Sequence, residues 1–155
     1  FATCDFITQK ENILITGSTG AGKSYMASAI GHQACSLGFK TLYFNTSKLF
    51  TMLKTSKADG SYLKQVNKIE KQDLLILDDF GLKGLDTINR HSLMEIIEDR
   101  HGKKSTIIAS QLPVEAWHEI IGEQTIADAI LDRLVHTAHR IDIKGESMRK
   151  KLKNK

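Results

Sequence analysis

Short apolar runs alternate along this chain with longer segments in which apolar residues recur every three or four positions. The short runs have the length and composition of buried strands. The longer segments have the periodicity of helices that bury one face. The pattern predicts strands at 12–16, 41–45, 74–77, 105–109 and 140–143, and helices at 24–37, 49–53 with Thr46 or Ser47 as the N-cap, 62–69, 88–100, 113–120 and 126–135.

This alternation of strands and helices is typical of a parallel sheet covered by helices on both faces. The chain has 155 residues and a mass of 17.3 kDa, which fits one domain with one core. We therefore expect a single α/β domain with a parallel five-stranded sheet over residues 1–150, followed by a basic tail at 151–155.

The composition excludes several classes of protein. Hydrophobic residues make up 41% of the chain and charged residues 26%, which is typical of globular proteins and not of disordered ones. No run of 18 apolar residues predicts a membrane span, and the N-terminus lacks the features of a secretory signal. Two cysteines are too few for a disulfide framework, so we expect a cytoplasmic protein. The missing initial Met indicates a fragment without its N-terminal part.

The net charge of +4 is unevenly distributed along the chain. Residues 48–71 carry six lysines and two acidic residues, whereas residues 72–101 have a net charge of −4 and residues 144–155 one of +5. Basic blocks are typical of proteins with polyanion partners. A solvated lysine face has the same composition, so the charge alone does not decide between the two.

The segment 17–24, GSTGAGKS, matches the phosphate-loop pattern G-x-x-x-x-G-K-[ST] between a predicted strand and a predicted helix. Its glycines let backbone N–H groups point at a phosphate, and the helix adds its positive N-terminal end. In such loops the lysine reaches the β- and γ-phosphates and the hydroxyl binds Mg²⁺. The predicted ATP site comprises Gly17, Ser18, Thr19, Gly20, Ala21, Gly22, Lys23, Ser24 and the adjacent Tyr25.

Polar residues close two of the other predicted strands. Asp78 and Asp79 follow the apolar run at 74–77, and we assign Asp78 with Ser24 to Mg²⁺ and Asp79 to the attacking water. A pair of carboxylates that caps a turn is the alternative. Gln111 follows the fourth strand, where its side chain can contact the γ-phosphate because ligands bind at the carboxyl ends of parallel strands. A polar strand end without a catalytic role explains Gln111 equally well.

Taken together, these residues resemble the AAA+ ATPases and, more closely, the IstB-like transposition helper ATPases, relatives of the DnaC helicase loaders. The resemblance extends from about residue 12 to residue 150. The phosphate loop and the acidic strand end are shared by many P-loop ATPases, whereas the later segments are more specific. The segments that carry it are 17–24, LLILDDFG at 74–81, SQLP at 110–113 with Trp117, ADAILDRL at 127–134 and GESMR at 145–149.

The resemblance implies an ATP-dependent AAA+ core that assists an insertion-sequence transposase in selecting or remodelling target DNA. From the length of 155 residues we expect this core without the usual helical lid domain. It implies homo-oligomers that hydrolyse ATP at subunit interfaces. Arg133 falls at the arginine-finger position, where it would act in trans, and Arg149 falls at the sensor-2 position. Gln111, or alternatively Ser110, falls near the sensor-1 position. On residue chemistry alone, both arginines are better explained as structural or surface residues. The family also has an N-terminal adaptor segment before this core, and we expect that this sequence does not include it.

One residue departs from the common AAA+ pattern. Most members of the superfamily have Glu where this chain has Asp79, which is shorter by one methylene. We therefore expect slow ATP hydrolysis that acts as a switch and not as a motor.

The resemblance also gives the basic block a function. In this clade a helical insertion after the second strand faces DNA, and here it would span about 46–71. The candidate phosphate contacts are Lys54, Lys57, Lys64 and Lys68. Lysines offer point charges and no base-edge code, so we expect binding to duplex DNA that tolerates any sequence and weakens with salt.

Three other functions are alternatives to a transposition helper, and they fit the sequence to different degrees. A DnaC-like helicase loader shares the same core. A small-molecule P-loop kinase would need an acceptor pocket and an arginine-bearing lid that closes within one subunit. A DNA-binding module with an inactive nucleotide site is disfavoured, because Lys23, Ser24 and Asp78 are all present.

Overall fold

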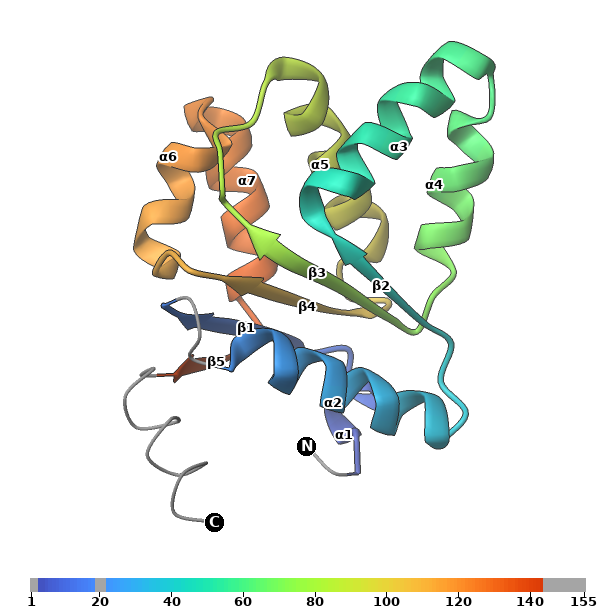
Figure 1. The fold of residues 1–155 in the computed structure, drawn as a ribbon, viewed down its shortest axis with the longest axis vertical. Coiled ribbons are helices and arrows are strands. Elements are labelled where there is room, and N and C mark those ends of the chain that lie inside the picture. The colour runs from blue at the N-terminus through green and yellow to red at the C-terminus, as the bar shows by residue number, and fades with distance from the viewer. Residues whose placement is uncertain (1–2, 19–21, 144–155) are drawn as a thin grey trace.

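A five-stranded parallel sheet forms the centre of the molecule (Figure 1). The computed structural model describes residues 3–18 and 22–143. The strand order is β2-β3-β4-β1-β5, so β1 and β3 lie on either side of β4. The strands are β1 (Asn12–Gly17), β2 (Thr41–Asn45), β3 (Leu74–Phe80), β4 (Ser105–Ser110) and β5 (Ala138–Ile143).

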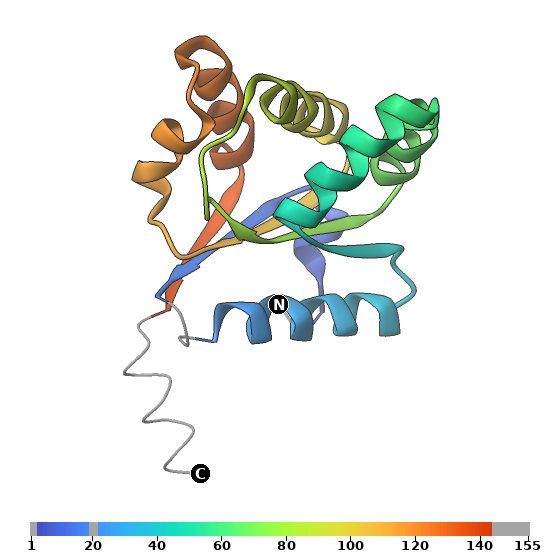
Figure 2. The same cartoon turned by 45° about the horizontal axis from the view of Figure 1, so that its top comes forward.

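Helices cover both faces of the sheet, but unequally. The short α1 and the long α2 lie on one face, and the remaining helices lie on the other (Figures 1 and 2). The helices are α1 (Asp5–Thr8), α2 (Lys23–Ser36), α3 (Thr46–Asp59), α4 (Tyr62–Glu70), α5 (Thr87–Arg100), α6 (Trp117–Ile121), which follows a 3-10 turn at Val114–Ala116, and α7 (Gln124–Val135).

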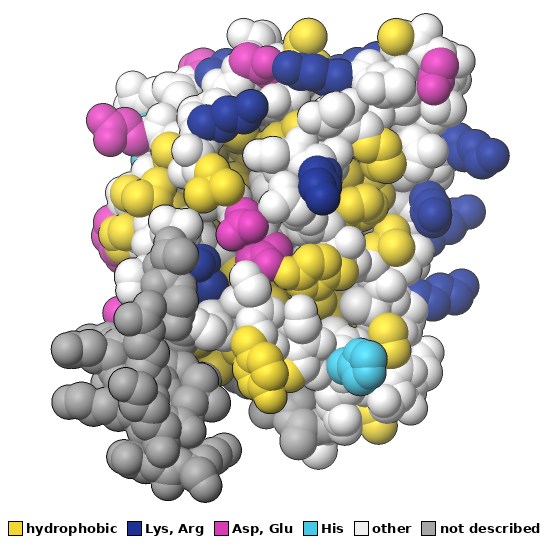
Figure 3. Space-filling view, viewed as in Figure 1, with side chains coloured by type: hydrophobic (Ala, Val, Ile, Leu, Met, Phe, Trp, Pro, Cys, Tyr) yellow, Lys and Arg dark blue, Asp and Glu magenta, His cyan; other side chains and the backbone are white. Residues whose placement is uncertain are grey.

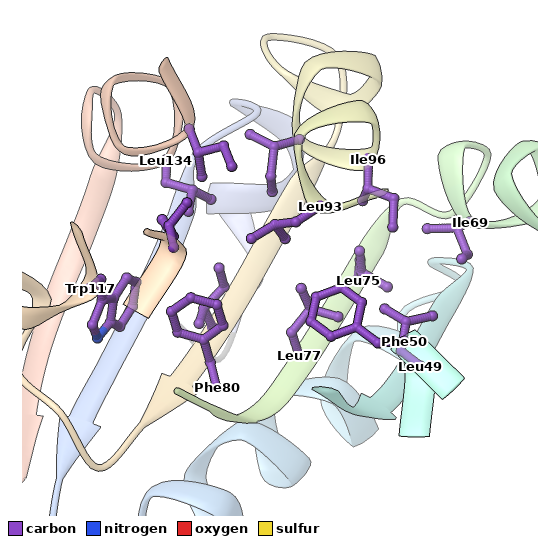
Figure 4. Close-up of a cluster of buried hydrophobic side chains, with 14 of the residues drawn as sticks. Leu49, Phe50, Ile69, Leu75, Leu77, Phe80, Leu93, Ile96, Trp117 and Leu134 are labelled. Carbon is purple, nitrogen blue, oxygen red and sulfur yellow. The ribbon is translucent and has the colours of Figure 1, made fainter. Parts of the chain in front are cut away.

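Alternate residues of the strands build two separate cores. In β1, Ile13 and Ile15 pack in the cluster under α2, whereas Leu14 packs in the larger cluster under α3–α7. In the larger cluster, the rings of Phe80 and Trp117 meet edge to face with their centroids 5.0 Å apart (Figure 4). Burial of both sheet faces explains why the inner strands β1, β3 and β4 are apolar over most of their length, whereas the edge strand β5 (AHRIDI) is partly exposed and carries charged residues.

The predicted α/β architecture is confirmed, and the differences are local. The strand predicted at 74–77 continues to Phe80, so Asp78 and Asp79 lie within the end of β3 and not after it. The N-cap of α3 is Asn45, which accepts a hydrogen bond from the Lys48 amide, so the prediction of Thr46 or Ser47 was wrong. The helix α1 was not predicted, because four residues carry no helical period.

The described residues form one α/β unit without a separate lid domain. The predicted basic tail at 151–155 lies outside them. Within residues 3–18 and 22–143, no helix is long and apolar enough to cross a membrane.

The guanidinium of Arg100 ties the α3–α4 segment to the sheet from inside the protein. Arg100 is 1% exposed, and it donates to the carbonyl oxygens of Ile69 at 2.9 Å, Gln72 at 2.7 Å and Ser105 at 2.5 Å. Its Nε donates to the Thr106 hydroxyl at 3.2 Å. Burial lowers the pKa of Arg100 to about 10, so the side chain stays charged at neutral pH and keeps these bonds.

Replacing Arg100 is therefore expected to destabilise the whole domain. Arg100→Met leaves several buried carbonyl groups without a donor and should lower the free energy of unfolding by about 3 kcal/mol. Urea unfolding followed by circular dichroism measures this. Arg140→Met is the control, because Arg140 is exposed and pairs with Glu115 at the surface. Equal stability of the two variants would contradict a stabilising role of Arg100.

Candidate functional site

The phosphate loop joins the carboxyl end of β1 to the start of α2, as the sequence predicts. β1 ends at Gly17 and α2 begins at Lys23. Gly22 precedes α2 with φ 96°, a left-handed conformation that favours glycine. Lys23 is 5% exposed and begins α2, and the N-terminus of a helix favours the binding of an anion. Thr19, Gly20 and Ala21 lie outside the described residues.

Asp78 lies next to this loop and is nearly buried, at 4% exposed. Its Oδ1 accepts hydrogen bonds from the Ser24 hydroxyl at 3.1 Å and from the Asp79 amide at 2.9 Å. Its Oδ2 accepts one from the Tyr43 hydroxyl. A hydroxyl and a carboxylate are oxygen ligands, which Mg²⁺ prefers, so Ser24 and Asp78 fit the metal of a Mg²⁺–nucleotide complex.

Asp79 has a backbone conformation unusual for a residue with a side chain. Its φ is 56°, and the pairing of β3 with β4 shifts register between Leu77 and Phe80. Such irregularities re-aim side chains at the end of a strand. Here the Asp79 carboxylate accepts a hydrogen bond from Asn45 Nδ2 at 3.1 Å. The other atom of that amide, Oδ1, caps α3, so Asn45 links the carboxylate to the α3–α4 segment.

Two site residues, Tyr43 and Asn45, were missed by the sequence analysis. Both lie on β2, and the register pairs Asn45 with Asp78 across the strands. Burial, together with the hydrogen bond to Asp78, raises the pKa of the Tyr43 phenol to about 12, while the Ser28 hydroxyl acts in the opposite direction. The polar residues in an otherwise apolar strand are the signal that could have indicated them.

Ser110 and Gln111 follow each other at the end of β4, but one is buried and the other is exposed. Ser110 is buried, and its hydroxyl donates to the Phe80 carbonyl at 2.6 Å and accepts from the Leu112 amide at 3.1 Å. Ser110 therefore joins β3 and β4. Gln111 is exposed directly after the carboxyl end of β4. Tyr25 is 74% exposed in the first turn of α2, and Arg149 lies outside the described residues.

Arg133 lies at the amino ends of the strands, whereas the phosphate loop lies at their carboxyl ends. It donates to the Ala129 carbonyl at 2.9 Å and to Glu98 at 3.2 Å. It also lines a small cavity with Asn12 and Thr106, which lie at the amino ends of β1 and β4. A strand of this length spans roughly 20 Å, so Arg133 cannot reach a nucleotide bound at the loop of its own subunit.

The four candidate DNA lysines divide into two pairs. Lys54 forms an ion pair with Asp86 at 2.5 Å, and the Lys57 ammonium lies 4.8 Å from the centre of the Tyr62 ring. Lys64 and Lys68 lie one turn apart on α4, and with Lys71 they line an open groove. Lysine and arginine side chains project from the edge of the molecule that carries α4 (Figure 3).

Comparison with protein families identifies one that covers the chain. The sequence model described as "IstB-like ATP binding protein" matches residues 1–155. A Sinorhizobium fredii protein named as an insertion sequence ATP-binding protein is 52% identical over 151 residues, which are 97% of this chain and 62% of the relative. A Geobacillus stearothermophilus protein with a similar name is 35% identical over 147 residues, 95% of this chain and 59% of the relative. The chain thus spans about three fifths of the length of these relatives.

Solved structures share the fold at lower sequence identity. The DnaC helicase loader superposes with a TM-score of 0.75 at 23% identity, over 90% of this chain and 85% of that one. DnaI superposes with a TM-score of 0.80 at 24% identity, over 92% of this chain and 81% of that one. These likenesses confirm the predicted P-loop ATPase fold.

Removal of the loop lysine tests the nucleotide site. Lys23→Ala should reduce the affinity for ATP by at least about a hundredfold, because the lysine charge faces the phosphates. Titration with a fluorescent ATP analogue measures this. Lys40→Ala, at an exposed lysine before β2, is the control and should bind normally. An unchanged affinity in the Lys23 variant would contradict the assignment of the phosphate loop.

Proposed function

The chain belongs to the IstB-like ATP-binding protein family, and from that premise we propose that it is an ATPase core that binds duplex DNA and assists an insertion-sequence transposase. The observation that carries the proposal is the contact between Ser24 of the phosphate loop and Asp78, with Asp79 beside them. The names of the relatives, which are insertion-sequence proteins, support the transposition context.

In the proposed mechanism, the phosphate loop holds ATP and the acidic strand end prepares its hydrolysis. Lys23 binds the β- and γ-phosphates, and Ser24 and Asp78 hold Mg²⁺. The bound ion would neutralise part of the phosphate charge. Asp79 orients the attacking water and accepts its proton, and Gln111 contacts the γ-phosphate from the end of β4. Arg149 would act on the same phosphate.

The hydrogen bond between Asn45 and Asp79 supports a slow, switch-like hydrolysis. The hydrogen bond from Asn45 occupies one acceptor site of the Asp79 carboxylate and restricts how that carboxylate can turn toward the water. Because Asn45 also caps α3, a shift of the α3–α4 segment on DNA would change this contact. Hydrolysis is then coupled to what the segment binds.

The position of Arg133 supports an oligomer with ATP at its interfaces. An arginine that cannot reach the nucleotide of its own subunit can act on a neighbour's if the subunits assemble head to tail. This arrangement disfavours a small-molecule kinase, which closes an arginine over its own phosphates. A helicase loader shares the fold and remains the alternative function.

DNA binding is assigned mainly to α4 and not equally to all four lysines. Lys64, Lys68 and Lys71 line one groove, whereas Lys54 is neutralised by Asp86. These three lysines, two on α4 and one at its C-cap, can contact successive backbone phosphates of a duplex without reading its sequence.

A mixing experiment tests hydrolysis across the interface. Arg133→Ala and Asp79→Asn subunits should each lose ATP turnover by roughly 10³-fold or more, since one lacks the arginine and the other the base. An equal mixture should recover about a quarter of the wild-type rate, because one interface in four pairs an intact site with an intact arginine. Steady-state phosphate release measures the rate. Failure to recover at any ratio, with nucleotide still bound, would contradict action in trans.

The DNA surface is tested through the salt dependence of binding. The triple variant Lys64→Ala, Lys68→Ala, Lys71→Ala should lower the slope of log K against log salt by about 2 to 3 for a duplex of any sequence. Fluorescence anisotropy at several salt concentrations measures the slope. The matched variant Lys54→Ala, Lys57→Ala should change it less. Equal slopes for the wild type and the triple variant would place the DNA elsewhere.

A further inference from the structure

The hydroxyl of Tyr43 contacts the proposed Mg²⁺ site from the edge strand. Since Asn45 pairs with Asp78, Tyr43 lies on the same face of the sheet and diagonally across from the carboxylate. A phenol is long enough to cover that diagonal, and its O–H donates to Asp78 Oδ2. Tyr43 has no role in the mechanism of ATP hydrolysis proposed above.

The three hydrogen bonds to Asp78 leave its carboxylate little freedom to rotate. Ser24 and the Asp79 amide hold Oδ1, and Tyr43 holds Oδ2. Rotation about the last torsion of an aspartate is otherwise broad. Loss of the Tyr43 bond would let the carboxylate turn, so that Oδ1 no longer faces Ser24 in one fixed orientation.

The ring of Tyr43 contributes little to the packing of the protein. It is 44% exposed and belongs to neither hydrophobic cluster of the described residues. The neighbouring Leu42 and Phe44, on the opposite face of β2, pack against the larger cluster instead. Tyr43 therefore faces inward through its hydroxyl, which donates to Asp78 and also interacts with the Ser28 hydroxyl.

We propose that Tyr43 is a positioning residue for the metal: it orients Asp78 so that the carboxylate and Ser24 together hold the Mg²⁺ that accompanies ATP. The proposal rests on the nucleotide site proposed above and adds a residue to it. Residues that hydrogen-bond to a metal ligand typically change metal affinity by ten- to a hundredfold when they are removed.

The test separates metal binding from nucleotide binding. The affinity of the protein for a fluorescent ATP analogue is measured first in EDTA and then at increasing free Mg²⁺. Tyr43→Phe keeps the ring and should raise the half-saturating Mg²⁺ concentration about tenfold, with the affinity in EDTA unchanged. A merely structural role would not move the metal dependence alone.

The chain offers a matched control in Tyr62. Its hydroxyl also donates to a carboxylate, that of Glu95 at 2.6 Å, but between α4 and α5 and away from the phosphate loop. Tyr62→Phe therefore removes the same kind of bond and should leave both the EDTA affinity and the Mg²⁺ dependence as in the wild type. Circular dichroism checks that both variants are folded.

Each other outcome overturns the proposal. An unchanged Mg²⁺ dependence in Tyr43→Phe means that Asp78 does not need the phenol. If Tyr43→Phe loses as much affinity for the ATP analogue in EDTA as it does in Mg²⁺, Tyr43 supports the phosphate loop and not the metal. Wild-type binding that does not respond to Mg²⁺ at all would instead overturn the metal site of the proposed function, and with it the role of Tyr43.

Discussion

The burial of the Asp78 carboxylate is the constraint on which the site depends. A charge that is removed from water is tolerated only if it is hydrogen-bonded or paired. Its hydrogen-bond donors come from β3 itself, from the first turn of α2 and from β2. The site therefore forms only when the phosphate loop lies beside β3 and when β2 pairs with β3 in the observed register. Fold and site are specified by the same contacts.

The parallel sheet separates the remaining functional groups in space. Ser24, Asp78, Asp79 and Gln111 gather at the carboxyl ends of the strands, whereas Arg133 lies at the amino ends. The α4 lysines lie beyond the β2 edge, on a segment anchored by Arg100. In the assembly that we propose, one subunit presents a nucleotide site at the carboxyl ends of its strands and, at their amino ends, an arginine for the site of a neighbouring subunit. In our account this separation makes hydrolysis depend on assembly.

The sequence predicted those parts of the fold that local patterns determine. The inner strands follow from short apolar runs, and the phosphate loop follows from a motif whose residues are contiguous. The roles of Tyr43 and Asn45 depend instead on the β2–β3 register, which no local pattern contains. The left-handed Asp79 and the cap at Asn45 depend on the same strand end. A role of Arg133 in trans was indicated only by the family resemblance, because its distance from the phosphate loop depends on how the sheet folds.

The most direct test of this account is a crystal structure of the protein with Mg²⁺ and a non-hydrolysable ATP analogue. We expect the phosphates over residues 17–24, the metal bound by the Ser24 hydroxyl, and Asp78 facing the metal with its bond to Tyr43 retained. Phosphates bound elsewhere, for example in the α4 lysine groove, or a metal without Ser24 and Asp78 beside it, would contradict it.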